Sequence, residues 1–132
     1  MEAAGAWGED AAAAWYEAAG FTVMSRNWCC PQGELDLVVH RAPGPGRRAT
    51  LVFVEVKARS SERFGTPAEA LTPVKRRRVR RAASAWLAAH RRNGGWGDLR
   101  FDLAAVTRAP HRRGGTGGSG VGVLVEIVED AM

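Results

Sequence analysis

The sequence predicts an α/β fold in which a mixed sheet of about five strands is flanked by α-helices on both sides. The order of elements supports this fold class, because one helix, three strands, a second helix and two more strands follow one another. Segment 50–57 is short, β-branched and nearly all apolar, which is typical of a central strand covered on both faces. We expect a single domain over residues 1–132, a length that can bury its own core.

Two helices are expected from apolar residues at helical spacing. The first runs from about Trp7 to Ala19, where Gly20 can end it, and the second from Thr72 to about Ala89, with Thr72 as N-cap. The pattern of the first helix rests on Trp7, Ala11, Ala14, Trp15 and Ala18. The stripe expected to be buried on the second helix is Val79, Ala82, Ala83, Trp86 and Leu87.

Four further strands are expected around the central one. Alternation predicts strands at 21–25 and 35–40, with a turn over 27–33 between them. Two more strands are expected at 100–106 and 121–128. The connections predicted as loops are 42–48, 59–70 and the glycine-rich, flexible segment 111–120.

The charge balance favours a polyanionic partner. Lys and Arg number 19 and Asp and Glu 14, which gives a net charge of +5. Only Lys57 and Lys75 are lysines, so all the other residues in the Lys and Arg total are arginines. The two cysteines, Cys29 and Cys30, are adjacent and lack the spacing of a zinc site, which predicts reduced thiols in a cytoplasmic protein. We expect no membrane span and no secretory signal.

Acidic residues and a lysine gather on two strands that follow each other in the chain. Glu55 and Lys57 are two residues apart, so they share one face of the central strand. An isolated pair of this kind is usually a salt bridge at a strand end. Asp36 on the preceding strand can converge with Glu55 if the strands are neighbours. Glu34 is two residues from Asp36 and could share its face, but a position in the solvated turn suits it equally well.

This set of residues suits metal-dependent phosphodiester hydrolysis. Carboxylate oxygens favour hard cations such as Mg²⁺ or Mn²⁺, which can activate water and offset charge on a phosphate. A lysine nearby can orient the water or stabilise the same charge. The residues therefore predict a metal site at Asp36 and Glu55 with Lys57 beside it.

Several motifs together resemble those of the YraN family of bacterial endonuclease-like proteins. The motifs are WGED (7–10), RNW (26–28), GELDLV (33–38), LVFVEVKAR (51–59), FGTPAEALTPVKRRRVRRAA (64–83) and RFDLAAV (100–106). That family is similar to archaeal Holliday junction resolvases and implies a restriction-endonuclease-like PD-(D/E)XK core. In this sequence Leu35 replaces the proline that gives the first motif its name.

The resemblance implies an endonuclease acting on duplex or branched DNA in repair or recombination. It implies that Asp36 and Glu55 bind metal, that Lys57 is catalytic and that Glu9 is an additional acid of the site. Without it, Glu9 and Asp10 are acids that favour the dipole of a first helical turn. A homodimer would suit cleavage of a symmetric junction, although no interface can be inferred from the residues.

A run of cations opens the second predicted helix. These residues oppose the helix dipole and repel one another, so a phosphate backbone would stabilise them. No aromatic residue is interleaved, which favours duplex or branched DNA over stacked single strands. The residues predicted to bind nucleic acid are Lys75, Arg76, Arg77, Arg78, Arg80 and Arg81, and Lys75 could instead point toward the catalytic end.

Two alternatives remain open at this point. The same fold could bind nucleic acid with little or no catalysis, or the acids and Lys57 could form a buried ion network. The sequence contains no phosphate-binding loop of the G-x-x-x-x-G-K-[ST] type. Asp102 is expected to be a structural acid, and surface or loop positions are expected for His40, His90 and His111.

Overall fold

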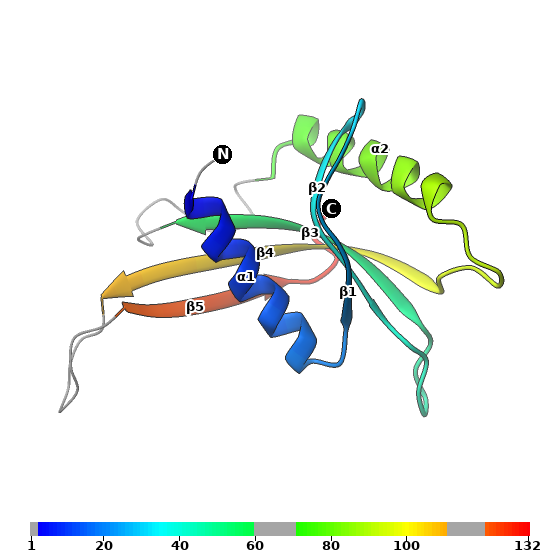
Figure 1. Cartoon of the computed structure of the whole chain (residues 1–132), viewed down its shortest axis with the longest axis horizontal. Coiled ribbons are helices and arrows are strands. Elements are labelled where there is room, and N and C mark those ends of the chain that lie inside the picture. The colour runs from blue at the N-terminus through cyan, green and yellow to red at the C-terminus, as the bar shows by residue number, and fades with distance from the viewer. Residues whose placement is uncertain (1–2, 60–70, 111–120) are drawn as a thin grey trace.

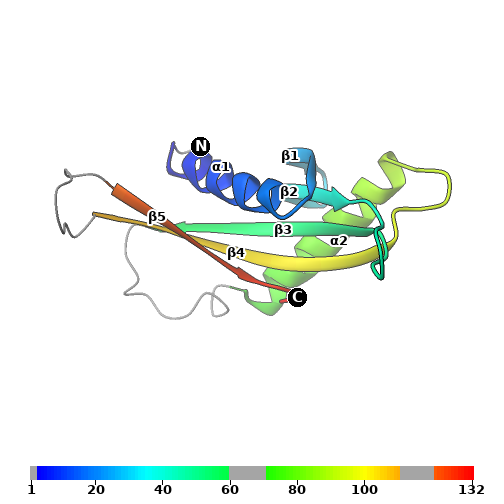
Figure 2. The ribbon, with the colours of Figure 1, turned by 90° about the horizontal axis from the view of Figure 1, so that it is seen from below.

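The structure, a computed structural model, describes residues 3–59, 71–110 and 121–132, so the loop predicted at 111–120 lies outside the described residues. Five strands form one mixed sheet with a helix on each face, which confirms the predicted fold class (Figures 1 and 2). The helices are α1 (Ala3–Ala18) and α2 (Pro73–Ala89). The strands are β1 (Thr22–Cys30), β2 (Gly33–Arg41), β3 (Thr50–Arg59), β4 (Asp98–Pro110) and β5 (Val121–Val128).

The strands lie in chain order across the sheet, from β1 to β5. Neighbouring strands are antiparallel except β3 and β4, which are parallel because the chain crosses over through α2 between them. The central strand β3 has no exposed residue from Thr50 to Val56, as expected for a strand covered on both faces.

Alternation along β3 divides the core into two layers. Val52 and Val54 face α1 and pack with Tyr16 and Phe21, whereas Leu51 and Phe53 face α2 and pack with its buried stripe. The α2 residues in that stripe are Val79, Ala82, Ala83 and Trp86, as predicted, with Leu87 partly buried. Helix α2 begins as expected, since the Thr72 hydroxyl accepts a hydrogen bond from the Lys75 N–H at 3.2 Å.

The buried face of α1 agrees only in part with the predicted one, since Trp7 and Ala11 pack against the core as expected but the rest of the predicted stripe does not. Ala12, Ala13 and Tyr16 are buried, whereas Ala14 and Ala18 are exposed and Trp15 keeps 38% of its surface exposed. An alanine-rich helix offers little contrast between its faces. The orientation instead follows from Tyr16, whose hydroxyl has a buried partner on β4.

The turn predicted over 27–33 is wrong from Asn27 to Cys30, because β1 continues through these residues. Asn27 has φ of 50°, and asparagine tolerates this left-handed conformation, so a turn-forming residue stands inside a strand. The surface position expected for His40 is also wrong. Its side chain is buried beneath Trp96, with Nε2 3.2 Å from the Trp96 carbonyl oxygen.

Neither α1 nor α2, the helices of the described residues, has the length and apolar character that crossing a membrane requires.

Candidate active site

The sheet splits between β2 and β3, and the candidate site lies at the split. The β2–β3 ladder extends from Arg41 opposite Thr50 to Leu37 opposite Val54. Beyond that pair, β2 continues with β1 as far as Gly33, while β3 continues with β4 as far as Arg59. Figure 1 shows the β1–β2 hairpin rising beside α2 as β3 runs away from it.

Asp36 occupies the point where the two strands part. Its Oδ2 accepts a hydrogen bond of 2.9 Å from the backbone N–H of Val56, which lies beyond the last β2–β3 pair. The side chain thus replaces a backbone acceptor that a longer ladder would supply. The alternation of side chains along β2 is also interrupted here. Leu35 and Leu37 are two residues apart and would share one face of a regular strand, but Leu35 packs toward α2 and Leu37 toward α1.

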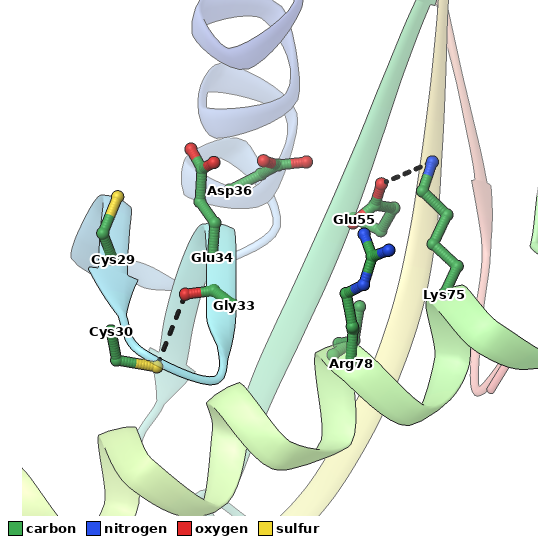
Figure 3. A pocket seen from close by; sticks show the side chains of 9 residues that line it. Cys29, Cys30, Gly33, Glu34, Asp36, Glu55, Lys75 and Arg78 are labelled. Carbon is green, nitrogen blue, oxygen red and sulfur yellow. Dashed lines mark hydrogen bonds and ion pairs between the residues drawn. The ribbon is translucent and has the colours of Figure 1, made fainter.

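A cleft of about 450 Å³ opens beside this split, between the two strands and the first turns of α2. Figure 3 shows Glu55 on β3 facing Lys75 and Arg78, which rise from α2. The Lys75 ammonium lies 3.3 Å from Oε2 of Glu55, whose side chain is 14% exposed. The lining residues are Cys29, Cys30, Gly33, Glu34, Asp36, Glu55, Lys75, Arg78 and Val79. The predicted convergence of Asp36 and Glu55 is therefore present in the fold.

Like charges crowd Asp36. Burial, followed by the charge of Glu55, raises the pKa of Asp36 to about 7. Glu9 and Glu34 raise this pKa further, whereas the hydrogen bond from Val56 lowers it. Burial and neighbouring acids thus disfavour the ionised form of Asp36, and an added cation would stabilise it.

Glu9 approaches the split from α1, held by a residue of β1. Its side chain is buried, and its Oε1 accepts a hydrogen bond of 2.8 Å from Nδ2 of Asn27. The preceding residue of β1 and the following residue of α1 form a second contact, an ion pair of 2.7 Å between Arg26 and Asp10. The WGED and RNW motifs are therefore one structural unit. Gly8 lets α1 approach β3 closely, because a Cβ at this position would lie only 2.7 Å from the Cβ of Ala58.

The predicted catalytic lysine lies outside the cleft. Lys57 is exposed and is not among the residues that line it. Two cations of α2, Lys75 and Arg78, occupy the cleft instead.

The remaining cations of the α2 run are Arg76, Arg77, Arg80 and Arg81, all of them exposed. The Arg80 guanidinium lies over the Phe101 ring at 5.0 Å and donates to the Met132 carbonyl, so this residue also anchors the C-terminal segment. Arg76, Arg77 and Arg81 are available on the outer surface of the helix.

The donors present fit a hard divalent cation. The carboxylates of Asp36 and Glu55 supply oxygen ligands, and within the described residues nothing donates a hydrogen bond to Oδ1 of Asp36. No group of three or more His, Cys, Asp or Glu side chains in these residues is arranged to hold a metal. Such an ion would therefore rely on water or a phosphate oxygen for its other ligands, as Mg²⁺ commonly does.

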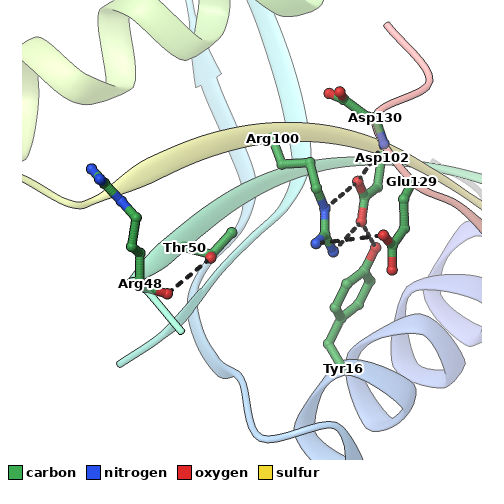
Figure 4. Close-up of polar contacts among 7 residues, drawn as sticks. All are labelled: Tyr16, Arg48, Thr50, Arg100, Asp102, Glu129 and Asp130. Atoms are coloured by element: carbon green, nitrogen blue, oxygen red, sulfur yellow. Dashed lines mark hydrogen bonds and ion pairs between the residues drawn. The ribbon is translucent and has the colours of Figure 1, made fainter. Parts of the chain in front are cut away.

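Asp102 on β4 is a structural acid, as predicted. Its carboxylate is fully buried and accepts hydrogen bonds from the Tyr16 hydroxyl at 2.7 Å and from the Asp130 N–H at 3.0 Å. Arg100 adds two more, at 2.9 and 3.0 Å. Figure 4 shows these donors converging on Asp102.

Sequence reasoning missed the role of Asn27 at the site, and it predicted Arg78 to bind nucleic acid without placing it in the cleft. The RNW motif singles out Asn27 without indicating its partner, because Glu9 is 18 residues away. Arg78 was one cation of a run, and only the packing of α2 distinguishes it. Cys30 also lines the cleft, with its thiol 3.4 Å from the Gly33 carbonyl oxygen, and both cysteines are free thiols as predicted.

Comparison with known proteins places this chain among bacterial relatives of similar length. A UPF0102 protein of Beutenbergia cavernae is 50% identical over 107 residues, covering 81% of this chain and 84% of the relative. A UPF0102 protein of Nocardia farcinica is 46% identical over 112 residues, covering 85% and 82%. The sequence profile described as "Uncharacterised protein family UPF0102" matches residues 8–106, which include the whole cleft. The chain therefore belongs to the UPF0102 family, also called the YraN family.

Proposed function

We propose that this protein is a divalent-metal-dependent DNA endonuclease that hydrolyses phosphodiester bonds. The observation that carries the proposal is the pair of acids, Asp36 and Glu55, in one cleft with two cations from α2. A phosphodiester substrate is anionic, so it needs cations for binding, while hydrolysis needs an activated water.

The carboxylates of Asp36 and Glu55 would hold Mg²⁺ or Mn²⁺. When bound, such an ion supplies a water of lowered pKa and offsets charge on the phosphate. Arg78, which lines the cleft without a carboxylate partner in the described residues, would bind a phosphate oxygen of the substrate. Glu9, held by Asn27, adds negative charge near Asp36 and so favours cation binding.

The exposed arginines of α2 would bind the DNA backbone beside the cleft. Arg76, Arg77 and Arg81 are exposed, and the helix carries no acidic residue in its first turn. Because contacts of this kind release counterions, binding should weaken steeply with salt. Branched DNA as the substrate and action in repair or recombination follow from the family resemblance, and a cytoplasmic location follows from the adjacent free cysteines. Lys57, which is exposed on the same strand as Glu55, would contact the substrate outside the cleft.

A second candidate function is DNA binding without catalysis. Two observations favour it: Lys57 lies outside the cleft, and Lys75 already forms an ion pair with Glu55. In that case the acids and Lys75 would form an ion network that stabilises the split of the sheet.

Cleavage of a panel of duplex, flap and four-way-junction DNAs, with Mg²⁺ or Mn²⁺ at low salt, tests the proposal. We expect Glu55→Gln and Asp36→Asn to lower the cleavage rate by at least about 100-fold while DNA binding persists. Glu126→Gln is the matched control, because Glu126 is an exposed acid on β5. Equal cleavage by all four proteins would indicate a contaminating nuclease. Tight, salt-sensitive binding with no cleavage would favour the second candidate.

A further inference from the structure

The ammonium of Lys75 stands where a cation is needed in the cleft. It lies 3.3 Å from Oε2 of Glu55, one of the two acids assigned to the metal. The backbone fixes its position, because the Thr72 side chain caps α2 by accepting the Lys75 N–H at 3.2 Å. Pro73 begins the helix directly after this cap. The Lys75 side chain therefore reaches β3 from a fixed point on α2.

This ion pair offsets two unfavourable charges. A cation in the first turn opposes the helix dipole, and the side chains of Arg76 and Arg78 add like charge nearby. On the other side of the cleft, Glu55 shares the lining with a second carboxylate, Asp36, of the same charge. Lys75 is 36% exposed, so water can reach the pair and the ammonium can leave it.

Arg78 provides an internal comparison. It lies three residues after Lys75, lines the same cleft and carries the same charge. In the described residues it forms no ion pair with Glu55 or any other acid. The two cations carry the same charge in the same cleft, but only Lys75 contacts a proposed metal ligand directly.

We propose that Lys75 is a tethered counter-cation that pairs with Glu55 when no metal is bound, is displaced by the divalent cation, and then binds a phosphate of the DNA. This inference rests on the proposed function, since it assigns Glu55 to the metal. Lys75 and the metal compete for one carboxylate. Metal binding and the Lys75–phosphate contact therefore favour each other, and this coupling is reciprocal.

Metal binding without DNA tests the competition directly. Mn²⁺ affinity would be measured by titration calorimetry and by the loss of the free-ion EPR signal, for the wild type, Lys75→Met, Arg78→Met and Asp36→Asn. We expect Lys75→Met to bind Mn²⁺ about three- to tenfold more tightly than the wild type, because the competing ammonium is gone. Arg78→Met removes the same charge from the same cleft, and its affinity should rise by less than about twofold.

DNA binding tests the second half of the inference. Affinity for a four-way junction would be compared in EDTA and with Ca²⁺ as a probe for the divalent ion. We expect Lys75→Met to lose about three- to tenfold in affinity with Ca²⁺ and little in EDTA, where Glu55 holds the ammonium in the wild type. Arg78→Met should lose similar affinity in both conditions.

The outcomes separate this inference from the proposed function. One outcome is that Mn²⁺ binds, Asp36→Asn abolishes binding, and Lys75→Met binds no more tightly than Arg78→Met. The metal would then bind at Asp36 as proposed, but it would not displace Lys75 from Glu55. Weaker Mn²⁺ binding by Lys75→Met would likewise overturn displacement, because it would make Lys75 a support for the site. Absence of any Mn²⁺ binding that depends on Asp36 would overturn both the metal site and the role of Lys75.

Discussion

Two carboxylates in this fold, Asp102 on β4 and Asp36 on β2, are removed from solvent in opposite ways. Asp102 is fully buried and surrounded by donors from Arg100, Tyr16 and the backbone of Asp130. Asp36 accepts one backbone hydrogen bond, and three acids, Glu55, Glu9 and Glu34, lie close enough to raise its pKa. One acid is stabilised by its surroundings and the other is destabilised by them.

The difference indicates which acid is structural and which is available for a ligand. A buried charge with a full set of donors has nothing to gain from a further cation, since its donors already compensate it. Burial and neighbouring acids raise the pKa of Asp36 to about 7, so its ionised form lowers the stability of the fold. Such unfavourable groups cluster at functional sites. Asp36 therefore has the properties of a site residue, although both acids lie on strands of the same sheet.

The largest expected effect is an opposite response of the two acids to the same substitution. At pH 8, Asp102→Asn should lower the free energy of unfolding by about 3–5 kcal/mol, because it removes the buried acidic partner of Arg100 and leaves only the exposed Glu129, at 3.7 Å. Asp36→Asn should raise the free energy of unfolding, because it removes a charge that burial and the neighbouring acids disfavour. Urea denaturation of both variants measures these changes. A loss of stability in both variants would contradict the contrast.

The pH dependence of stability sharpens the same comparison. The folded-state pKa of Asp36 is about 7 against 3.8 for the free group, so the folded chain holds this proton more tightly. The stability gained by keeping Asp36 protonated is complete below about pH 4 and is lost as the pH rises through 7.

The wild type should therefore lose about 2–4 kcal/mol relative to Asp36→Asn between pH 4 and pH 8. Denaturation of both proteins across this range measures the difference, and ionisations they share cancel. Mg²⁺ at pH 8 should restore part of the loss in the wild type only. Parallel pH profiles would show that Asp36 ionises normally in the fold.

Local patterns in the sequence predict the fold class and the meeting of Asp36 with Glu55. The apolar run around Val54 identifies a central strand, and strand periodicity then assigns Glu55 to one face. Asp36 follows because consecutive strands usually pair, and β2 does pair with β3. These steps need only neighbouring residues and a simple topology.

The other parts of the site depend on how distant segments pack, and here the sequence supplies at most a candidate, as with Lys75, which is one of two lysines and could point toward the catalytic end. The pairing of Lys75 with Glu55 is set by the position of α2 at the split of the sheet. Tyr16 sets the face of α1 through Asp102, which is 86 residues away. Asn27 shows the limit of turn propensity, since a residue typical of turns lies within β1.

Glu9 is intermediate between Asp102, which has a full set of donors, and Asp36, which has one backbone donor. We expect loss of the donor to Glu9 to change stability least among these predictions. Glu9 is buried like Asp102, but within the described residues only Asn27 donates to it, at 2.8 Å. Asn27→Gly keeps the left-handed φ of 50° and removes only the donor, so it should cost about 1 kcal/mol.

Asn27→Ala removes the same donor and adds backbone strain, so it should cost about 1 kcal/mol more than Asn27→Gly. Urea denaturation of both variants and of Glu9→Gln measures these costs. In a Glu9→Gln background, Asn27→Gly should cost less, because the acceptor is no longer charged. An unchanged cost there would mean that Asn27 supports β1 alone, and that Glu9 is held at the split by the packing of α1.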